Sequence, residues 1–380
     1  MKKYFYGIAA MILPIILLMT GCSHKPASYQ CADTAMGTII SQTIYVTTEE
    51  QEAKEVSKQV IDRMKELEQN TLSWRLATSE VYRINESAGR GEGVEMSPLL
   101  DNVLDKCKKV YAASEGAFDF TIGSLTRLWN IDAWAGQSVN GLAENSLADH
   151  AQSGSGKTES DIPEAEKQKA YTLPTEERIS EVLRFVGGDK CRVEGNQITL
   201  PEGMQLDLGA VGKGIALDET YKLLKQQDKV TGAVISAGGS ILTYGSKPDG
   251  SLWNVGIVNP SDTGRTLGIL SVPGGFCIAT SGDYERYVEV DGVRYHHILD
   301  PRTGKPADSG VKSVTILCRI RQEQLDNSGL LSDALSTACF VLGVEEGLKL
   351  AEVFDAEVLF VDTEGEIIMS EGMKQYFHLS

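Results

Sequence analysis

The order of strand-like and helix-like segments limits the possible folds of this 380-residue chain more than any other pattern. In its second half, helical spacing occurs before and after a series of strand-like segments, at 214–226, 332–342 and 344–354. A regular βαβ array would place a helix after each strand. The sequence therefore predicts an α+β fold of mixed strands and helices. The strand-like segments, each bounded by turn residues, are 232–241, 253–258, 266–272, 276–281, 286–290 and 311–318.

The first half of the chain mixes both kinds of element and contains one long irregular segment. Residues 135–169 collect Gly, Ser, Ala, Asn and charged residues with little periodicity. This composition predicts a flexible surface insertion rather than a part of the core. Around it, the patterns predict a strand at 36–46, helices at 49–69, 99–114 and 176–186, and a hairpin around 194–196.

The N-terminus has the layout of a secretory leader. Lys2 and Lys3 precede an apolar run at 4–19, which ends in small residues and Cys22. The run is interrupted by a proline and is shorter than the roughly 20 apolar residues that span a bilayer, which argues against a transmembrane anchor. A cysteine directly after the small residues predicts a lipoprotein, with lipid carried on Cys22.

This leader predicts three parts in the chain: a signal peptide at 1–21, a tether at 22–30 and a folded domain at 31–380. The domain is long enough for one large unit or two fused ones. A lipoprotein leader places the protein at the cell membrane, held by its lipid anchor on the extracytoplasmic face.

Charge and cysteine usage exclude some partners. The formal net charge is -17, which argues against a nucleic-acid partner because binding to nucleic-acid phosphates requires basic surface. A phosphate site in so acidic a chain would need a local lysine or a divalent cation. No CxxC pair occurs, which argues against a zinc site, and Cys107, Cys318 and Cys339 lie in apolar stretches typical of buried free thiols.

Residues 207–214 form the richest polar motif, with Asp207, three glycines and Lys213 within eight residues. Glycine allows close backbone approach to a ligand, and an adjacent helix start offers unpaired N–H groups to an anion. The segment matches neither the P-loop nor the dinucleotide-binding fingerprint. It predicts a phosphate-binding turn of another kind.

Two further clusters contain side chains suited to catalysis or metal binding. Residues 295–306 place paired imidazoles, a carboxylate and two cations around a proline-containing turn. Asp333, Ser336 and Thr337 have spacings of three and four, so on a helix their oxygens share one face. Hard oxygen ligands suit Mg²⁺ or Ca²⁺. Spacing alone favours the alternative that Asp333 is a helix N-cap, with Ser332 as a rival cap.

Taken together, these clusters resemble the ApbE family of FAD:protein FMN transferases over nearly all of the expected domain. Seven landmarks occur in family order. They are residues 36–38, 116–119, 207–214, 236–240, 279–286, 297–306 and 333–337. The family fold is a T-fold-related α+β architecture with the FAD and metal site between two lobes.

The resemblance implies which residues form that site. The metal, Mg²⁺, would be held by the Ala210 carbonyl, Asp333, Thr337 and Ser336. Ser240 departs from the Asp or Asn of many relatives, and the insertion at 135–169 is longer than usual. The implied FAD contacts are Met36, Trp74, Ala117, Phe118, Asp119, Asp207, Lys213 and the backbone near Leu299.

The resemblance also implies the reaction: Mg²⁺-dependent transfer of the FMN moiety of FAD to a threonine or serine hydroxyl of an exported flavoprotein, with release of AMP. That acceptor would be a subunit of a membrane redox complex or another exported flavoprotein. The metal and Lys213 would stabilise charge that develops at the phosphates. His297 is the best candidate for the base that accepts the hydroxyl proton, with Asp207 orienting the site or binding FAD.

Three other functions remain open from the sequence. A Mg²⁺-dependent FAD pyrophosphatase would use the same residues with water as the acceptor. A flavin-carrying electron-transfer protein would retain FAD and reduce it reversibly, and a lipid-anchored binding module would hold FAD without consuming it. The spacing of Asp333 and Thr337 favours the two enzymes, because neither binding function requires metal ligands.

Overall fold

A computed structural model describes residues 26–135, 171–321 and 327–380. The predicted signal peptide, Cys22 and nearly all of the expected insertion at 135–169 lie outside these residues. Within the described ranges, no helix combines the length and the apolar character needed to cross a bilayer.

The fold is centred on an eight-stranded sheet in which every neighbouring pair is antiparallel. This confirms the predicted α+β class, because a βαβ array would give parallel neighbours, and all the neighbouring strands here run antiparallel. The strands, in spatial order, are β1 (Ala27–Ala35), β2 (Thr38–Val46), β6 (Val230–Ala237), β7 (Ser240–Gly245), β10 (Phe276–Gly282), β15 (Val311–Arg319), β16 (Glu357–Asp362) and β17 (Ile367–Met369).

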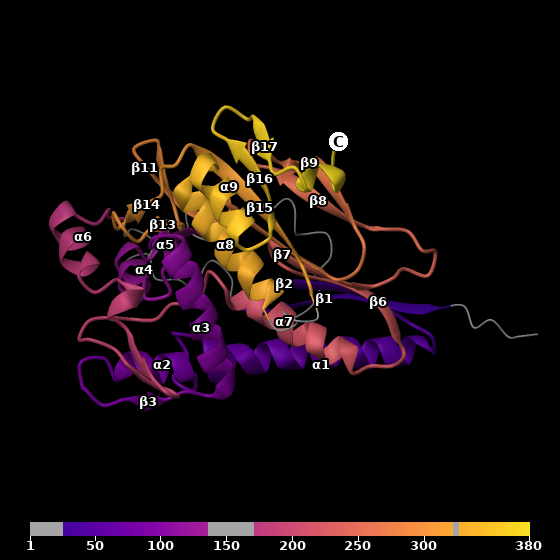
Figure 1. Cartoon of the computed structure of the whole chain (residues 1–380), viewed down its shortest axis with the longest axis horizontal. Coiled ribbons are helices and arrows are strands. Elements are labelled where there is room, and N and C mark those ends of the chain that lie inside the picture. The colour runs from indigo at the N-terminus through magenta and orange to yellow at the C-terminus, as the bar shows by residue number, and fades with distance from the viewer. Residues whose placement is uncertain (1–25, 136–170, 322–326) are drawn as a thin grey trace, which may run out of the picture.

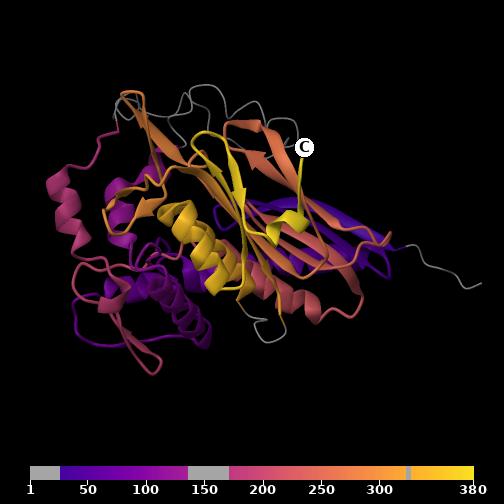
Figure 2. The ribbon, with the colours of Figure 1, turned by 45° about the horizontal axis from the view of Figure 1, so that its top comes forward.

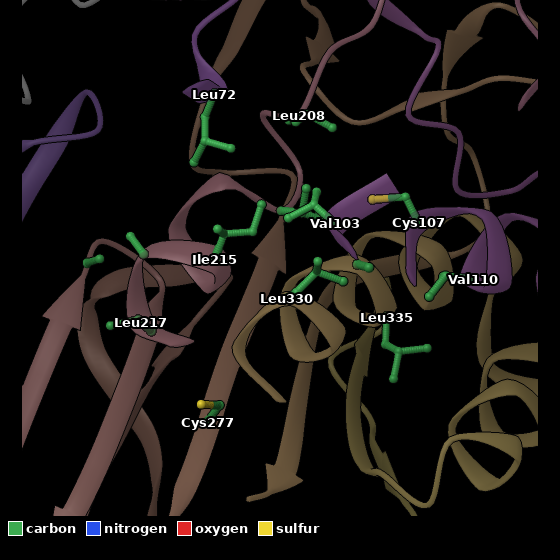
Figure 3. Close-up of a cluster of buried hydrophobic side chains, with 14 of the residues drawn as sticks. Leu72, Val103, Cys107, Val110, Leu208, Ile215, Leu217, Cys277, Leu330 and Leu335 are labelled. Atoms are coloured by element: carbon green, nitrogen blue, oxygen red, sulfur yellow. The ribbon is translucent and has the colours of Figure 1, made fainter. Parts of the chain in front are cut away.

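Helices cover one face of this sheet (Figures 1 and 2). Those in contact with its strands are α1 (Glu50–Leu67), α7 (Gly212–Lys225), α8 (Ser328–Leu342) and α9 (Val344–Val353). Alternating residues of the inner strands, such as Ile40 and Ile44 of β2, point into this layer and are fully buried. Figure 3 shows the part of this core where α7, α8 and α3 (Pro98–Ala113) meet, with Ile215, Leu330 and Val103 in one cluster.

A smaller sheet covers part of the opposite face. It contains β8 (Trp253–Asn259), β9 (Asp262–Val272) and β18 (Phe377–Leu379). Its apolar side packs on the outward residues of the large sheet and forms a second core that includes Trp253, Leu270 and Phe276. The large sheet is therefore covered on both faces where the small sheet lies, and the ends of its strands remain available to form a site.

The second lobe lies beside one end of the sheet (Figure 1). A third core, with Leu125 and Trp129, joins its upper part to the hairpin of β11 and β12. The main core continues into the lower part through Val81 and Ile198, so the two lobes share one interior. The lobe's elements are α2 (Glu80–Glu86), β3 (Val94–Glu95), α3, α4 (Gly123–Trp129), α5 (Ile131–Ala135), α6 (Glu176–Leu183), β4 (Arg192–Glu194), β5 (Gln197–Thr199), β11 (Tyr287–Val290), β12 (Val293–His296), β13 (Leu299–Asp300) and β14 (Lys305–Pro306).

Most predicted elements are confirmed, with several local differences. The segment predicted as one strand at 232–241 is a hairpin, because Gly238 and Gly239 form a turn between β6 and β7. Helix α8 begins at Ser328, before the predicted start at 332.

Residues 27–30, expected in the tether, belong to β1, because backbone pairing with β2 orders a segment of little apolar character. The strand predicted at 36–46 starts at Thr38, since Met36 and Gly37 form the turn of this hairpin with φ of 56° and 68°. Residue 135 of the expected insertion ends α5.

The cysteines follow the prediction from their apolar surroundings. Cys107, Cys318 and Cys339 are buried and free. Burial raises the pKa of each of these thiols, which keeps them protonated and unreactive.

Candidate active site

One cavity of about 800 Å³ lies between the two lobes, where the ends of the sheet strands meet α4 and α5. It brings together every FAD, metal and catalytic residue predicted from the sequence outside the leader. These residues are Met36, Trp74, Ala117, Phe118, Asp119, Asp207, Ala210, Lys213, His297, Leu299, Asp333, Ser336 and Thr337. They come from segments as far apart as Met36 and Thr337, so the fold and not the local sequence assembles them.

Asp333 occupies the inner corner of this cavity. Helix α8 begins at Ser328, so Asp333 lies in its second turn and does not cap its own helix, contrary to the expectation from spacing. Its Oδ2 accepts the Gly214 backbone N–H at 2.7 Å, and its Oδ1 accepts the Ser240 hydroxyl at 2.5 Å. Lys213 places Nζ 3.9 Å from Oδ2. Asp333 therefore caps the first turn of α7 and joins the glycine-rich turn to α8.

A second carboxylate makes the reverse connection between these helices. Asp218 of α7 accepts the backbone N–H groups of Gly329 and Leu330 at 2.7 and 2.9 Å, at the start of α8. Burial raises the pKa of Asp218 to about 7 in spite of these two hydrogen bonds. The helices touch through backbone: a Cβ on Gly214 would lie 2.1 Å from the Gly329 carbonyl oxygen. This contact fixes α7, with Lys213, against α8, with Asp333.

The oxygen atoms around Asp333 fit a hard divalent cation. The hydroxyls of Ser281 and Ser336 are 2.8 Å apart, and Ser281 lies 3.5 Å from the Thr337 hydroxyl. Asp333 uses one acceptor position on each oxygen for protein hydrogen bonds, which leaves further lone pairs for a metal. Six carboxylates and three fixed cations line the described part of the cavity, so a bound dinucleotide would need a cation to balance its phosphates. Ala210 lines the same cavity.

Asp119 and Asp207 both accept hydrogen bonds from the backbone of the turns in which they lie. Asp119 accepts from the Thr121 backbone and hydroxyl, both at 2.7 Å, and from the Gly188 N–H at 3.1 Å. Asp207 accepts the Gly209 N–H at 2.8 Å. Burial raises the pKa of both carboxyls. Asp119 therefore fixes the shape of the turn that carries Ala117 and Phe118, and this turn lines the cavity.

His297 has the tautomer needed for a base at the cavity. Its Nδ1 lies 3.1 Å from the Arg286 carbonyl oxygen, which can only accept, so Nδ1 carries the proton and Nε2 is left with a lone pair. Burial, the Arg286 guanidinium, His296 and Lys213 lower the pKa of His297 well below its usual value. The imidazole is thus neutral at physiological pH and able to accept a proton at Nε2.

A cluster of three charged residues at the cavity mouth was missed in the sequence. Asp132 of α5 accepts Arg75 Nη2 at 3.0 Å on one oxygen and Arg286 Nη1 at 2.8 Å on the other. The Arg75 guanidinium lies 4.0 Å from the ring centroid of Trp74. These residues are 57 and 154 positions from Asp132, so no local spacing could have indicated their contact.

Comparison with protein families gives a match over most of this fold. The model of the ApbE family matches residues 36–360. An FAD:protein FMN transferase of Klebsiella pneumoniae is 33% identical over 321 residues, covering 84% of this chain and 85% of that protein. The FAD:protein FMN transferase of Vibrio cholerae is 29% identical, covering 99% of this chain and 97% of that protein.

Solved structures share the architecture. The ApbE protein of Thermotoga maritima superposes with a TM-score of 0.73 and 28% identity, over 92% of this chain and 99% of that chain. The flavin transferase ApbE of Vibrio cholerae gives 0.71 and 25%, over 92% and 99%. The likeness therefore extends over most of the fold.

Proposed function

This chain belongs to the ApbE family, and on that basis we propose that it is an FAD:protein FMN transferase, the activity for which its relatives are named. The acceptor is a threonine or serine hydroxyl of an exported flavoprotein. In the reaction the hydroxyl oxygen bonds to the FMN phosphorus of FAD, the bond from that phosphorus to the bridging oxygen breaks, and AMP leaves. The hydroxyl proton passes to a base.

The observation that carries this proposal is the convergence of Asp333, Lys213 and His297 on one cavity. Lys213 lies beside Asp333 at the end that is rich in hard oxygen atoms. Its ammonium would neutralise charge on the pyrophosphate. His297 offers the Nε2 lone pair to the acceptor hydroxyl. Mg²⁺, held by Ala210, Asp333, Thr337 and Ser336, would supply further stabilisation of phosphate charge.

The remaining contacts would hold the two ends of FAD. Trp74 presents an aromatic ring to the cavity, suited to stacking on a flat heterocycle. Met36 is fixed by its N–H, which donates to Glu68 Oε2 at 2.9 Å. The turn of Ala117 and Phe118 and the buried Leu299 complete the apolar wall. These groups bind and orient the dinucleotide and take no proton.

We further propose that Cys22 carries a lipid and holds the domain at the extracytoplasmic face of the membrane. Strand β1 begins at Ala27, five positions later, and a chain of five residues spans at most about 17 Å. The domain would therefore work close to the membrane surface, where a subunit of a membrane redox complex is an accessible acceptor. Mass spectrometry of the membrane fraction tests this, with Cys22→Ser expected to release the protein.

The activity is tested by incubating the purified domain with FAD, Mg²⁺ and an exported flavoprotein domain. Covalent flavin fluorescence on the acceptor after denaturing electrophoresis is the expected result. Free FMN and AMP without a labelled acceptor would instead indicate an FAD pyrophosphatase. Unchanged FAD would reject both enzymes in favour of a binding or electron-transfer protein.

A further inference from the structure

The charged cluster at the cavity mouth, formed by Asp132, Arg75 and Arg286, connects three segments that the chain does not place together. Arg75 follows the π-helical turn at Glu68–Leu72, Asp132 belongs to α5, and Arg286 precedes β11. The side chains of Arg75 and Arg286 are 54% and 46% exposed. Ion pairs as exposed as these contribute about 0–1 kcal/mol to stability. Stability alone therefore does not account for two guanidiniums on one carboxylate beside a cavity.

Within this cluster, Arg286 contacts His297, the proposed base. The Arg286 carbonyl accepts both the backbone N–H of His297 at 3.0 Å and its Nδ1–H at 3.1 Å. The position of Arg286 thus determines where the imidazole lies and which nitrogen keeps the lone pair. Asp132 accepts a hydrogen bond from Arg286 Nη1 at 2.8 Å, and its negative charge offsets the guanidinium beside His297.

The second arginine of the cluster, Arg75, contacts Trp74. Asp132 holds the Arg75 guanidinium, which lies over the indole ring of Trp74. Arg127 lies 5.0 Å from the same ring centroid. A cation over an aromatic face is attracted to it, which favours the ring orientation that keeps the contact. The carboxylate of Asp132 therefore acts on the surroundings of both rings through the two guanidiniums that it holds.

We propose that Asp132 is a positioning residue for flavin transfer, holding His297 through Arg286 and Trp74 through Arg75. The inference rests on the proposed transferase function. Asp132 takes no proton and need not touch the reacting atoms. Its contribution is to keep the base and the stacking surface at a fixed separation across the mouth.

The charges that face His297 make this role testable in the ligand-free protein. They are Arg286 beside it, His296 preceding it and Lys213 from α7. Asp132→Asn removes the counter-ion of Arg286, so repulsion of the imidazolium grows and the pKa of His297 falls further. Arg286→Gln removes the repelling charge, so that pKa rises. A role confined to packing would not produce shifts of opposite sign.

The experiment is an NMR titration of ¹⁵N-histidine-labelled protein without FAD, with the His297 signal assigned through His297→Gln. The control is Asp105→Asn, because Asp105 also holds two cations, Lys109 at 2.9 Å and Lys106 at 3.1 Å, on the exposed face of α3. We expect Asp132→Asn to lower the pKa of His297 and Arg286→Gln to raise it. Asp105→Asn should leave it unchanged. Shifts of the same sign, or none, would overturn the proposal.

Transfer assays on the same proteins complete the test. Asp132→Asn should lower kcat by about 10- to 100-fold through misplacement of the base, with Asp132→Glu restoring part of the rate. An unchanged kcat in Asp132→Asn would also overturn the proposal. Failure of the wild-type protein to label any acceptor would reject the transferase function, whereas the titration would still report whether Asp132 controls His297.

Discussion

The contact between Gly214 and Gly329 predicts that one methyl group will disrupt the site. In Gly214→Ala, the new Cβ would lie 2.1 Å from the Gly329 carbonyl oxygen and 2.4 Å from its carbon. Ordinary contact requires about 3.5 Å, so α8 must retreat from α7 by roughly 1.4 Å. The neighbouring atoms belong to backbone and cannot rotate away, so the helix itself must move.

This displacement acts on both stability and catalysis. It stretches the hydrogen bonds that Asp333 and Asp218 make between the helices. Overpacking costs about 1–3 kcal/mol of stability, and the strained buried hydrogen bonds add to that cost. The change from glycine to alanine within a helix gains about 1 kcal/mol in helix propensity. We expect a net loss near 2 kcal/mol. Transfer should fall at least about 100-fold, because misplacement by 1 Å has that effect.

Urea unfolding followed by circular dichroism measures the stability, and covalent flavin on an acceptor measures transfer. The matched control is Gly264→Ala in β9, where the nearest atom to a new Cβ is Asp262 Oδ1 at 3.5 Å. It should leave both properties unchanged. If Gly214→Ala were as stable and as active as the wild type, the close approach of α7 and α8 would not position the site.

Three further predictions follow from single carboxylates and the base. His297→Gln should lower transfer by about 10²–10⁴-fold while FAD binding, followed by tryptophan fluorescence, is retained; equal transfer would reject His297 as the base. Because the folded state raises the pKa of Asp218 to about 7, the folded protein keeps a proton that the unfolded chain releases near pH 4. Stability should therefore fall by up to about 1.4 kcal/mol per unit as pH rises from 4 to 7. Asp218→Asn should remove this part of the slope in pH-dependent urea unfolding, and an unchanged slope would contradict the assignment. Asp333→Ala should abolish the Mg²⁺-dependence of transfer together with most of the activity, and full Mg²⁺-stimulated turnover in that variant would exclude Asp333 as a ligand.

Much of the fold could be predicted from local patterns. The central strands β6, β10 and β15 are apolar, mostly buried and bounded by turn residues, so their positions follow from the apolar pattern. Strand β1 was not predicted, because most of its positions alternate between half-exposed and exposed and it lacks the regular apolar residues of a buried strand. An edge strand of this kind is specified by pairing with β2, and no pattern within nine residues records that partner.

The site could be predicted where its residues form dense motifs. The run at 207–214 carries its glycines and charges close together, and Asp207, Ala210 and Lys213 line the cavity. Of the segment 295–306, His297 and Leu299 line it, whereas the charged side chains of the turn do not: Arg302 pairs with Asp300. The role of Asp333 was mistaken on spacing alone, because its hydrogen-bond donor Gly214 lies 119 positions earlier on another helix. The cluster around Asp132 depends on equally distant partners, so only the folded chain reveals it.

The central claim is that this cavity transfers FMN to a protein hydroxyl. The most direct test is intact-mass spectrometry of an exported flavoprotein acceptor after incubation with the wild-type domain, FAD and Mg²⁺. An increase of the acceptor mass by one FMN phosphoester, with one AMP released for each acceptor labelled, is the predicted result. An acceptor of unchanged mass, together with FAD that is either intact or hydrolysed to free FMN, would contradict the claim.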